Sequence, residues 1–213
     1  MTTLLLIRHG QSEANLNRCF AGQVDAQLTE LGILQAERTA DFIAENYRVH
    51  KVYASDLSRA ARTGQAVADR FGLPLQKTSM LREINAGLWE GLPFAQLDVE
   101  YPEEFDLWRE DIGNSRPTGG ESVAELAERI DQALRTIALE NPEQTVAVAF
   151  HAIPIRSVQW KLTGEPLSYM TQIPWVTNAS VTELFFENGE FRLGKVAQDQ
   201  HLEGIVTTIP KNI

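Results

Sequence analysis

Two short apolar runs, each ending within two residues of a histidine, constrain the fold of this chain most. Residues 4–7 precede Arg8 and His9, and residues 145–150 precede His151. Runs without polar alternation are typical of strands buried on both faces, as in a parallel sheet covered by helices. If the two strands are parallel neighbours, both histidines lie at one edge of the sheet. Open α/β sheets bind ligands at that edge, so a cation and an imidazole there predict an anion site.

Hydrophobic spacing and capping residues predict the other elements. We expect a helix over about 30–46 capped by Thr29 and then a strand over 51–54. A helix capped by Ser55 or Asp56 and ended by Gly72 follows, and then an edge strand over 74–77. The later part of the chain predicts helices over 121–141 and about 153–163, and two strands joined by a turn at Asn188 and Gly189. This alternation predicts a three-layer α/β/α sandwich with a mainly parallel sheet and an antiparallel C-terminal hairpin.

Residues 79–120 differ from the rest of the chain, because they combine many glycines and prolines with Trp89, Phe94 and Trp108. Long irregular segments in compact domains are usually functional or disordered, and the aromatic residues argue against disorder. We therefore expect a lid-like insertion of short helices over the sheet edge, with its aromatic side chains mainly in the core. The chain has no repeat or linker, so a single domain over residues 1–213 is expected.

The overall charge restricts the partners. A formal net charge of −10 argues against a nucleic-acid or anionic-membrane surface, but allows a local cationic pocket for a small phosphorylated substrate. Cys19 is the single cysteine, which excludes an internal disulfide and fits a reducing, cytoplasmic location. No apolar run is long enough for a signal peptide or a membrane span. The oligomeric state is left open.

Several sequence blocks stand in a recognisable order. They are Arg8-His9-Gly10 after its strand, then blocks within residues 20–36, 55–63, 81–91, 119–122 and 150–156. This ordered set resembles the histidine phosphatase superfamily, in its phosphoglycerate mutase-like branch. The resemblance covers most of the chain, which makes it far more specific than an isolated Arg-His-Gly tripeptide.

The resemblance implies a role for each of five residues. His9 would be the nucleophile, because a neutral imidazole nitrogen can attack phosphorus and leave a hydrolysable phosphohistidine. Arg8, Arg59 and His151 would hold the phosphoryl oxygens, where negative charge develops. Glu83 would protonate the leaving alkoxide and then activate water, which requires a pKa raised by burial. Glu90 is the nearest competitor for that role.

The resemblance also implies a substrate-binding set of Asn15, Gly22, Gln23 and Ala152. Asn15 would donate a hydrogen bond to the phosphoryl group. Ala152 stands where much of the family has glycine, and its cost depends on the backbone φ angle at that position. We expect no cofactor and no metal site, because no His, Cys or Asp set has ligand spacing.

Three departures bear on the reaction. Ala21, Ile84 and Ile153 stand where the phosphoglycerate mutases carry polar or basic residues, which favours hydrolysis of a small phosphomonoester. The alternatives are a bisphosphoglycerate-dependent phosphoglycerate mutase and a non-catalytic phosphate-binding module. Dependence on added 2,3-bisphosphoglycerate would identify the mutase, and phosphate binding without a phosphoenzyme would identify the module. The sequence leaves the identity of the phosphomonoester open.

Overall fold

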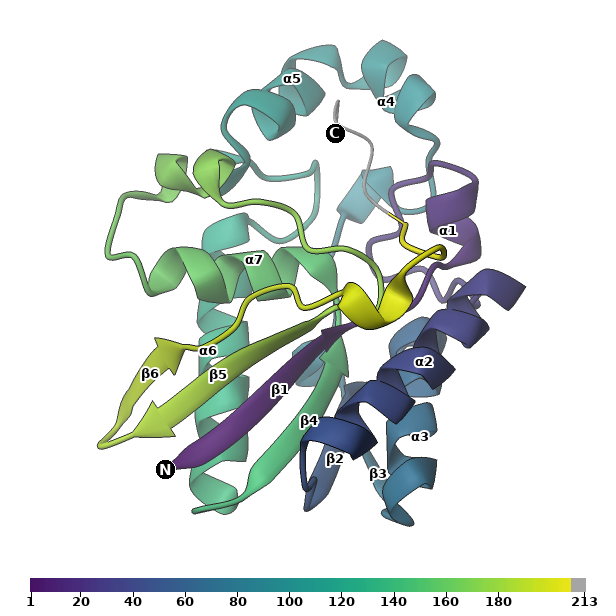
Figure 1. Cartoon of the computed structure of the whole chain (residues 1–213). Helices are drawn as coiled ribbons and strands as arrows, with labels where there is room; N and C mark the ends of the chain where they lie inside the picture. Colours follow the sequence, from purple (N-terminus) through teal and green to yellow (C-terminus); the bar gives the residue numbers. More distant parts are fainter. Residues whose placement is uncertain (208–213) are drawn as a thin grey trace.

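The computed structural model describes residues 1–207, and its strands form one sheet in the order β3-β2-β4-β1-β5-β6 (Figure 1). The strands are β1 (Thr2–Arg8), β2 (Lys51–Ser55), β3 (Leu75–Thr78), β4 (Thr145–Phe150), β5 (Val181–Glu187) and β6 (Glu190–Leu193). The first four in sequence pair in parallel, whereas β5 and β6 are antiparallel to their neighbours. The mainly parallel sheet with an antiparallel C-terminal hairpin is confirmed.

Helices cover both faces of the sheet. They are α1 (Glu13–Leu16), α2 (Glu30–Asn46), α3 (Ser58–Phe71), α4 (Phe94–Glu100), α5 (Pro102–Glu110), α6 (Val123–Glu140) and α7 (Ala152–Lys161). Leu5 and Ile7 of β1 pack in the core with α2 and α3. Leu4 and Leu6, which point to the opposite face, pack with α6 and α7. The predicted three layers are therefore present.

The register between β1 and β4 places the two histidines side by side. Arg8 pairs with Phe150 in this parallel ladder, so His9 and His151 both follow the last paired position. The backbone N–H of His9 donates a 3.0 Å hydrogen bond to the carbonyl oxygen of Phe150, which extends the ladder by one residue. The predicted adjacency of the two apolar strands is confirmed.

Local capping explains why α2 follows the sequence prediction closely. The side-chain oxygen of Thr29 accepts a 3.0 Å hydrogen bond from the backbone N–H of Gly32. The end of α3 was also predicted, because Gly72 adopts the left-handed conformation that terminates helices, with φ at 63°.

The predicted start of α3 was wrong. Neither Ser55 nor Asp56 caps the helix, which begins at Ser58. The carboxylate of Asp25 accepts hydrogen bonds from the backbone N–H and the hydroxyl of Ser58, at 2.6 and 2.7 Å. Asp56 instead forms an ion pair with Arg82. A distant loop supplies the acceptor, which capping rules for neighbouring residues do not detect.

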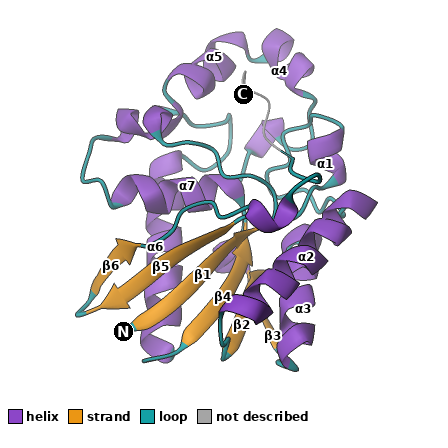
Figure 2. Cartoon of the chain, viewed as in Figure 1, coloured by secondary structure: helices purple, strands orange, loops and turns teal. Residues whose placement is uncertain are grey.

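The insertion forms short helices that pack against the sheet edge. Figure 2 shows α4 and α5 standing beyond the C-terminal ends of the parallel strands. Trp89, Phe105 and Trp108 are buried in the same core cluster as residues of β1, β4 and α6. The expectation of a single domain stays a prediction, which this shared core supports. No helix within residues 1–207 is both long and apolar enough to cross a membrane.

The shared core predicts a large stability cost for truncation of Trp89. We expect Trp89→Ala to lower the free energy of unfolding by about 3–5 kcal/mol, because it removes a fully buried aromatic side chain. The neighbouring Leu88 is 60% exposed, so Leu88→Ala is expected to change it by less than about 0.5 kcal/mol. Urea unfolding measures both variants. Two separate transitions in the wild-type protein would contradict a single domain.

Candidate active site

His9 lies at the C-terminal end of β1 in the neutral form that a nucleophile needs. Its Nδ1 lies 2.7 Å from the carbonyl oxygen of Gly10, which can only accept, so Nδ1 carries the proton. The lone pair is then on Nε2. Burial lowers the pKa of His9 well below its usual 6.5, and the charges of Arg59 and Arg8 lower it further.

His151 follows β4 and faces His9. The two ring centroids are 5.2 Å apart, in an edge-to-face arrangement. His151 is completely buried, and neither ring nitrogen forms a hydrogen bond with a described protein group. Burial, with the charge of Arg59 next, lowers its pKa well below the usual value. In the neutral ring one of the two unpaired nitrogens carries a proton that it can donate to an anion beside His9, although His151 does not itself line the pocket.

Arg8 and Arg59 bring two buried guanidinium groups to the same place, and backbone carbonyls fix both. Arg8 donates from Nη1 to the carbonyl oxygen of Val176 at 2.6 Å. Arg59, near the start of α3, donates from Nη1 and Nη2 to the carbonyl oxygens of Val24 and Gly22, each at 2.7 Å. The buried Nε of each arginine has no partner among the described residues.

The two guanidinium groups remain charged at neutral pH, because arginine side chains are not deprotonated in proteins. Burial lowers the pKa of Arg8 to about 10, still well above 7, and also lowers the pKa of Arg59. Neither forms an ion pair within 4 Å among the described residues, and Glu83 acts on both only at longer range. The pocket therefore holds positive charge that an incoming anion can balance.

Glu83 is held over the pocket by two backbone amides. Its Oε1 accepts from the N–H of Ile84 at 2.8 Å, and its Oε2 accepts from the N–H of Ile153 at 3.3 Å, in the first turn of α7. Burial raises its pKa to about 7, although these hydrogen bonds and the nearby Arg59 oppose the rise. A carboxyl with this pKa can give or take a proton near neutral pH.

Asn15 lines the pocket from the short helix α1, which the sequence did not predict. Its side-chain oxygen accepts from the backbone N–H and hydroxyl of Ser12, both at 3.1 Å, and from Nδ2 of Asn178 at 3.2 Å. With the oxygen engaged, the amide nitrogen of Asn15 is the group that can donate to a ligand.

Asn178 was missed by sequence reasoning. Besides Asn15, its amide nitrogen donates to the backbone carbonyl of His9 at 3.0 Å, so it ties the two residues together. Asn178 precedes β5, and because β5 is antiparallel to β1 its first residues reach the C-terminal end of β1. The sequence did indicate the C-terminal hairpin. Pairing its first strand with β1 would have placed Asn178 at the end of β1.

Gly22 and Gln23 occupy different positions although they are neighbours. Gly22 lines the pocket with φ at +48°, and a Cβ there would lie 2.5 Å from Oε1 of Glu90. Gln23 does not line the pocket. Its backbone N–H donates to the Glu90 carboxylate, and its side chain donates to the backbone carbonyl of Glu83 at 3.1 Å. Gln23 and Glu90 therefore contact the loop that carries Glu83.

Ala152 is the first residue of α7 and lines the pocket. Its φ is not in the left-handed region, so alanine carries no backbone penalty where much of the family has glycine.

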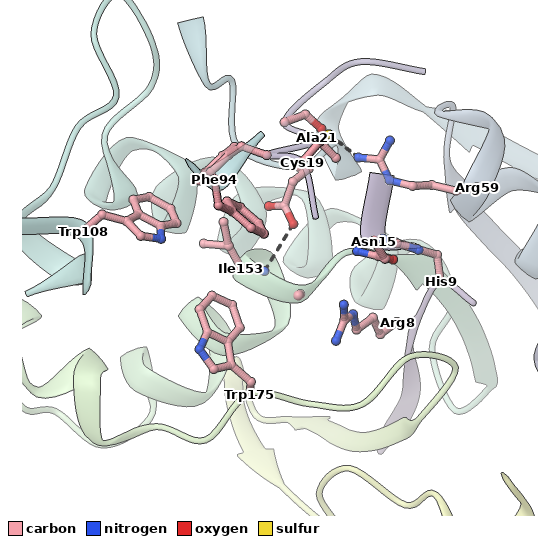
Figure 3. A pocket seen from close by; sticks show the side chains of 14 residues that line it. Arg8, His9, Asn15, Cys19, Ala21, Arg59, Phe94, Trp108, Ile153 and Trp175 are labelled. Atoms are coloured by element: carbon pink, nitrogen blue, oxygen red, sulfur yellow. Dashed lines mark hydrogen bonds between the residues drawn. The ribbon is translucent and has the colours of Figure 1, made fainter. Parts of the chain in front are cut away.

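The pocket has a polar half and an apolar half (Figure 3). The polar half holds Arg8, His9, Asn15, Arg59 and Glu83, and the apolar half holds Phe20, Phe94, Trp108, Ile153 and Trp175. Within residues 1–207, no three His, Cys, Asp or Glu side chains gather in a way that could hold a metal ion. The arrangement can bind an oxyanion at His9 and a second, apolar group beyond it.

The raised pKa of Glu83 predicts a pH-dependent effect on stability. The folded carboxyl keeps its proton between about pH 4.5 and 7, where the unfolded one loses it. The contribution of the Glu83 carboxyl to the free energy of unfolding is therefore fully present below pH 4.5. It disappears as the pH rises through 7. Glu83→Gln, which cannot ionise, is expected to gain melting temperature relative to wild type between pH 5 and 8.

Thermal unfolding at pH 5 and pH 8 measures this difference. Glu100→Gln, at an exposed position of α4, is the matched control and should shift far less with pH. If the melting temperatures of Glu83→Gln and wild type differ by the same amount at both pH values, the raised pKa of Glu83 is contradicted.

Comparison with known proteins extends over nearly the whole chain. The profile described as "Histidine phosphatase superfamily (branch 1)" matches residues 4–199. Phosphoserine phosphatase 1 of Hydrogenobacter thermophilus is 32% identical over 168 residues, 79% of either chain. Glucosyl-3-phosphoglycerate phosphatase of Mycobacterium tuberculosis is 31% identical over 189 residues, 85% of this chain and 84% of the relative.

The solved structure of Bacillus stearothermophilus YhfR has a TM-score of 0.90 at 27% identity and covers 95% of this chain and 100% of its own. The resemblance found in the ordered sequence blocks is thus confirmed, and the chain belongs to branch 1 of the histidine phosphatase superfamily.

Proposed function

We propose that the protein is a phosphatase that hydrolyses small phosphomonoesters through a phosphohistidine at His9. One observation carries the proposal: Arg8 and Arg59 line the same pocket as His9, His151 faces the His9 ring, and the buried Nε of each arginine and both ring nitrogens of His151 have no partner among the described residues. Unpaired buried donors are costly, and a phosphoryl group would satisfy them. The relatives that are named phosphatases support hydrolysis.

In the first step, Nε2 of His9 attacks phosphorus, and the bond from phosphorus to the ester oxygen breaks. Glu83 in its protonated form gives its proton to the leaving oxygen, which departs as an alcohol. The hydrogen bond from Nδ1 to the Gly10 carbonyl keeps the ring in the reactive tautomer. Arg8 and Arg59 stabilise the charge that develops on the phosphoryl oxygens.

In the second step, Glu83 is a carboxylate and takes a proton from water. The water oxygen attacks phosphorus, the bond from phosphorus to Nε2 breaks, and His9 returns to the neutral form. Phosphate is released and Glu83 is protonated again, which restores the enzyme. A pKa of about 7 lets one carboxyl serve in both directions near neutral pH.

Several binding roles belong to the proposal. Asn15 donates its amide N–H to the phosphoryl group, and the first turn of α7 at Ala152 faces the same group. Gly22 holds Arg59 through its carbonyl, and Gln23 acts through the Glu83 loop and not through the substrate. The arginines supply the positive charge, so no step in this route uses a metal ion or a cofactor.

We also propose a cytoplasmic location, because Cys19 is a free thiol and the only cysteine of the chain.

Loss of the nucleophile is expected to abolish the reaction. Wild-type protein should hydrolyse p-nitrophenyl phosphate in EDTA and form an acid-labile phosphoenzyme, whereas His9→Ala should do neither. His50→Ala is the control, because His50 lies outside the pocket and its Nδ1 accepts a hydrogen bond from the Thr145 N–H. Full activity of His9→Ala would exclude the proposed intermediate.

The role of Glu83 predicts a dependence on the leaving group. Poor leaving groups need its proton, so kcat/KM for an alkyl phosphate should fall as the pH rises above about 7. Glu83→Gln should lower kcat/KM for the alkyl ester by about 10²–10⁴-fold and for p-nitrophenyl phosphate by much less. Steady-state kinetics from pH 5 to 9 measure both. Equal losses for the two esters would argue against general acid catalysis by Glu83.

A further inference from the structure

The proposed function leaves the alcohol of the phosphomonoester open, and the apolar half of the pocket bears on it. Phe94 and Trp108 come from the insertion, and Trp175 comes from the segment that leads to β5 (Figure 3). Together with Ile153 and Phe20 they form the apolar side of the pocket, which we call the aromatic wall. An alcohol that leaves from His9 on the Glu83 side meets these side chains first.

Packing from behind holds the aromatic wall in place. Phe20 contacts Trp108 edge-to-face with 5.0 Å between ring centroids, and Phe94 stacks on Phe105 at 6.1 Å. These rings are fixed by their neighbours before any ligand arrives.

Trp175 is held by Arg156 of α7. The guanidinium carbon of Arg156 lies 4.2 Å from the centre of the Trp175 ring. Nε of Arg156 donates to the carbonyl oxygen of Ile173 at 2.7 Å, which fixes the segment that carries the ring. Arg156 therefore positions this part of the wall but does not itself line the pocket.

Arg156 lies behind the wall and outside the pocket lining, and the arginines of the insertion and of the first part of α6 are paired with carboxylates. Each basic side chain within residues 79–129 pairs with a carboxylate: Arg82 with Asp56, Arg109 with Asp98 and Asp106, Arg116 with Glu125, and Arg129 with Glu121. Among the described residues, only Arg8 and Arg59 bring a cation to the pocket lining, and both face the phosphoryl site. A carboxylate on the alcohol would lose water against aromatic rings without a cation in return.

We propose that the substrate is a phosphomonoester of an uncharged alcohol that carries an aromatic ring or a similar flat apolar group. Phe94 and Trp175 select this group by contact with its faces. The proposal rests on the proposed function. It differs from a simple transfer of substrate from the phosphoserine phosphatase relative, since phosphoserine carries a carboxylate on its leaving group.

The test compares three esters with similarly poor leaving groups. Benzyl phosphate carries the ring, 4-carboxybenzyl phosphate adds a charge to the same ring, and ethyl phosphate lacks the ring. We expect kcat/KM for benzyl phosphate to exceed each of the others by about tenfold or more, because ring burial is favourable and charge burial is not. O-phosphoserine is included as the fourth probe and should resemble 4-carboxybenzyl phosphate.

Variants of two wall residues test whether the wall causes the preference for a substrate with a ring. Phe94→Ala and Trp175→Ala, at half-buried positions, should lower the ratio of benzyl to ethyl phosphate in kcat/KM by about fivefold or more. Val99→Ala in α4 is the control, because Val99 is 78% exposed and outside the pocket. Competitive inhibition by inorganic phosphate reports whether the phosphoryl half of each variant is intact.

The outcomes separate the two proposals. If 4-carboxybenzyl phosphate or O-phosphoserine is used as well as benzyl phosphate, the selection of an uncharged ring is wrong while the phosphatase function stands. An unchanged ratio in both wall variants also overturns it. If the wild-type protein hydrolyses none of these esters nor p-nitrophenyl phosphate, the proposed function itself fails.

Discussion

The parallel pairing of β1 with β4 is the contact on which the site depends. Its register ends at Arg8 and Phe150, so the next residue of each strand is a histidine and the two rings face each other at 5.2 Å. Each further part of the site is attached to this edge. Segments before α3, before β5 and at the start of α7 all reach it, because strand ends in an α/β sheet share one edge.

Two buried cations at this edge of the sheet favour an anionic ligand. Arg8 and Arg59 are buried and held by backbone carbonyls, so their geometry is fixed, and within residues 1–207 neither forms a direct ion pair. Burial lowers the pKa of His9, and the two positive charges lower it further, so His9 is neutral. Burial also disfavours the charged form of Glu83, so it raises the pKa of this carboxyl and favours its protonated form. One environment thus prepares a neutral nucleophile, two cations and an acid.

Sequence reasoning succeeded where the information is local and failed where it is not. The helix α2 and the end of α3 were predicted because Thr29 and Gly72 act on their own helices. The start of α3 was wrong because Asp25, 33 residues away, supplies the acceptor. Asn178 was missed because its contact with His9 spans 169 residues and depends on the antiparallel placement of β5.

The sequence by itself determined the layered α/β architecture, the adjacency of His9 and His151, and the family. Unbroken apolar strands and ordered residue blocks encode these properties without knowledge of distant contacts. Only the tertiary structure decided the tautomer of His9, the backbone partners that fix both arginines, and the aromatic wall with Trp175 held by Arg156. These depend on which remote segments meet at one strand end, and that is settled by packing and not by local sequence.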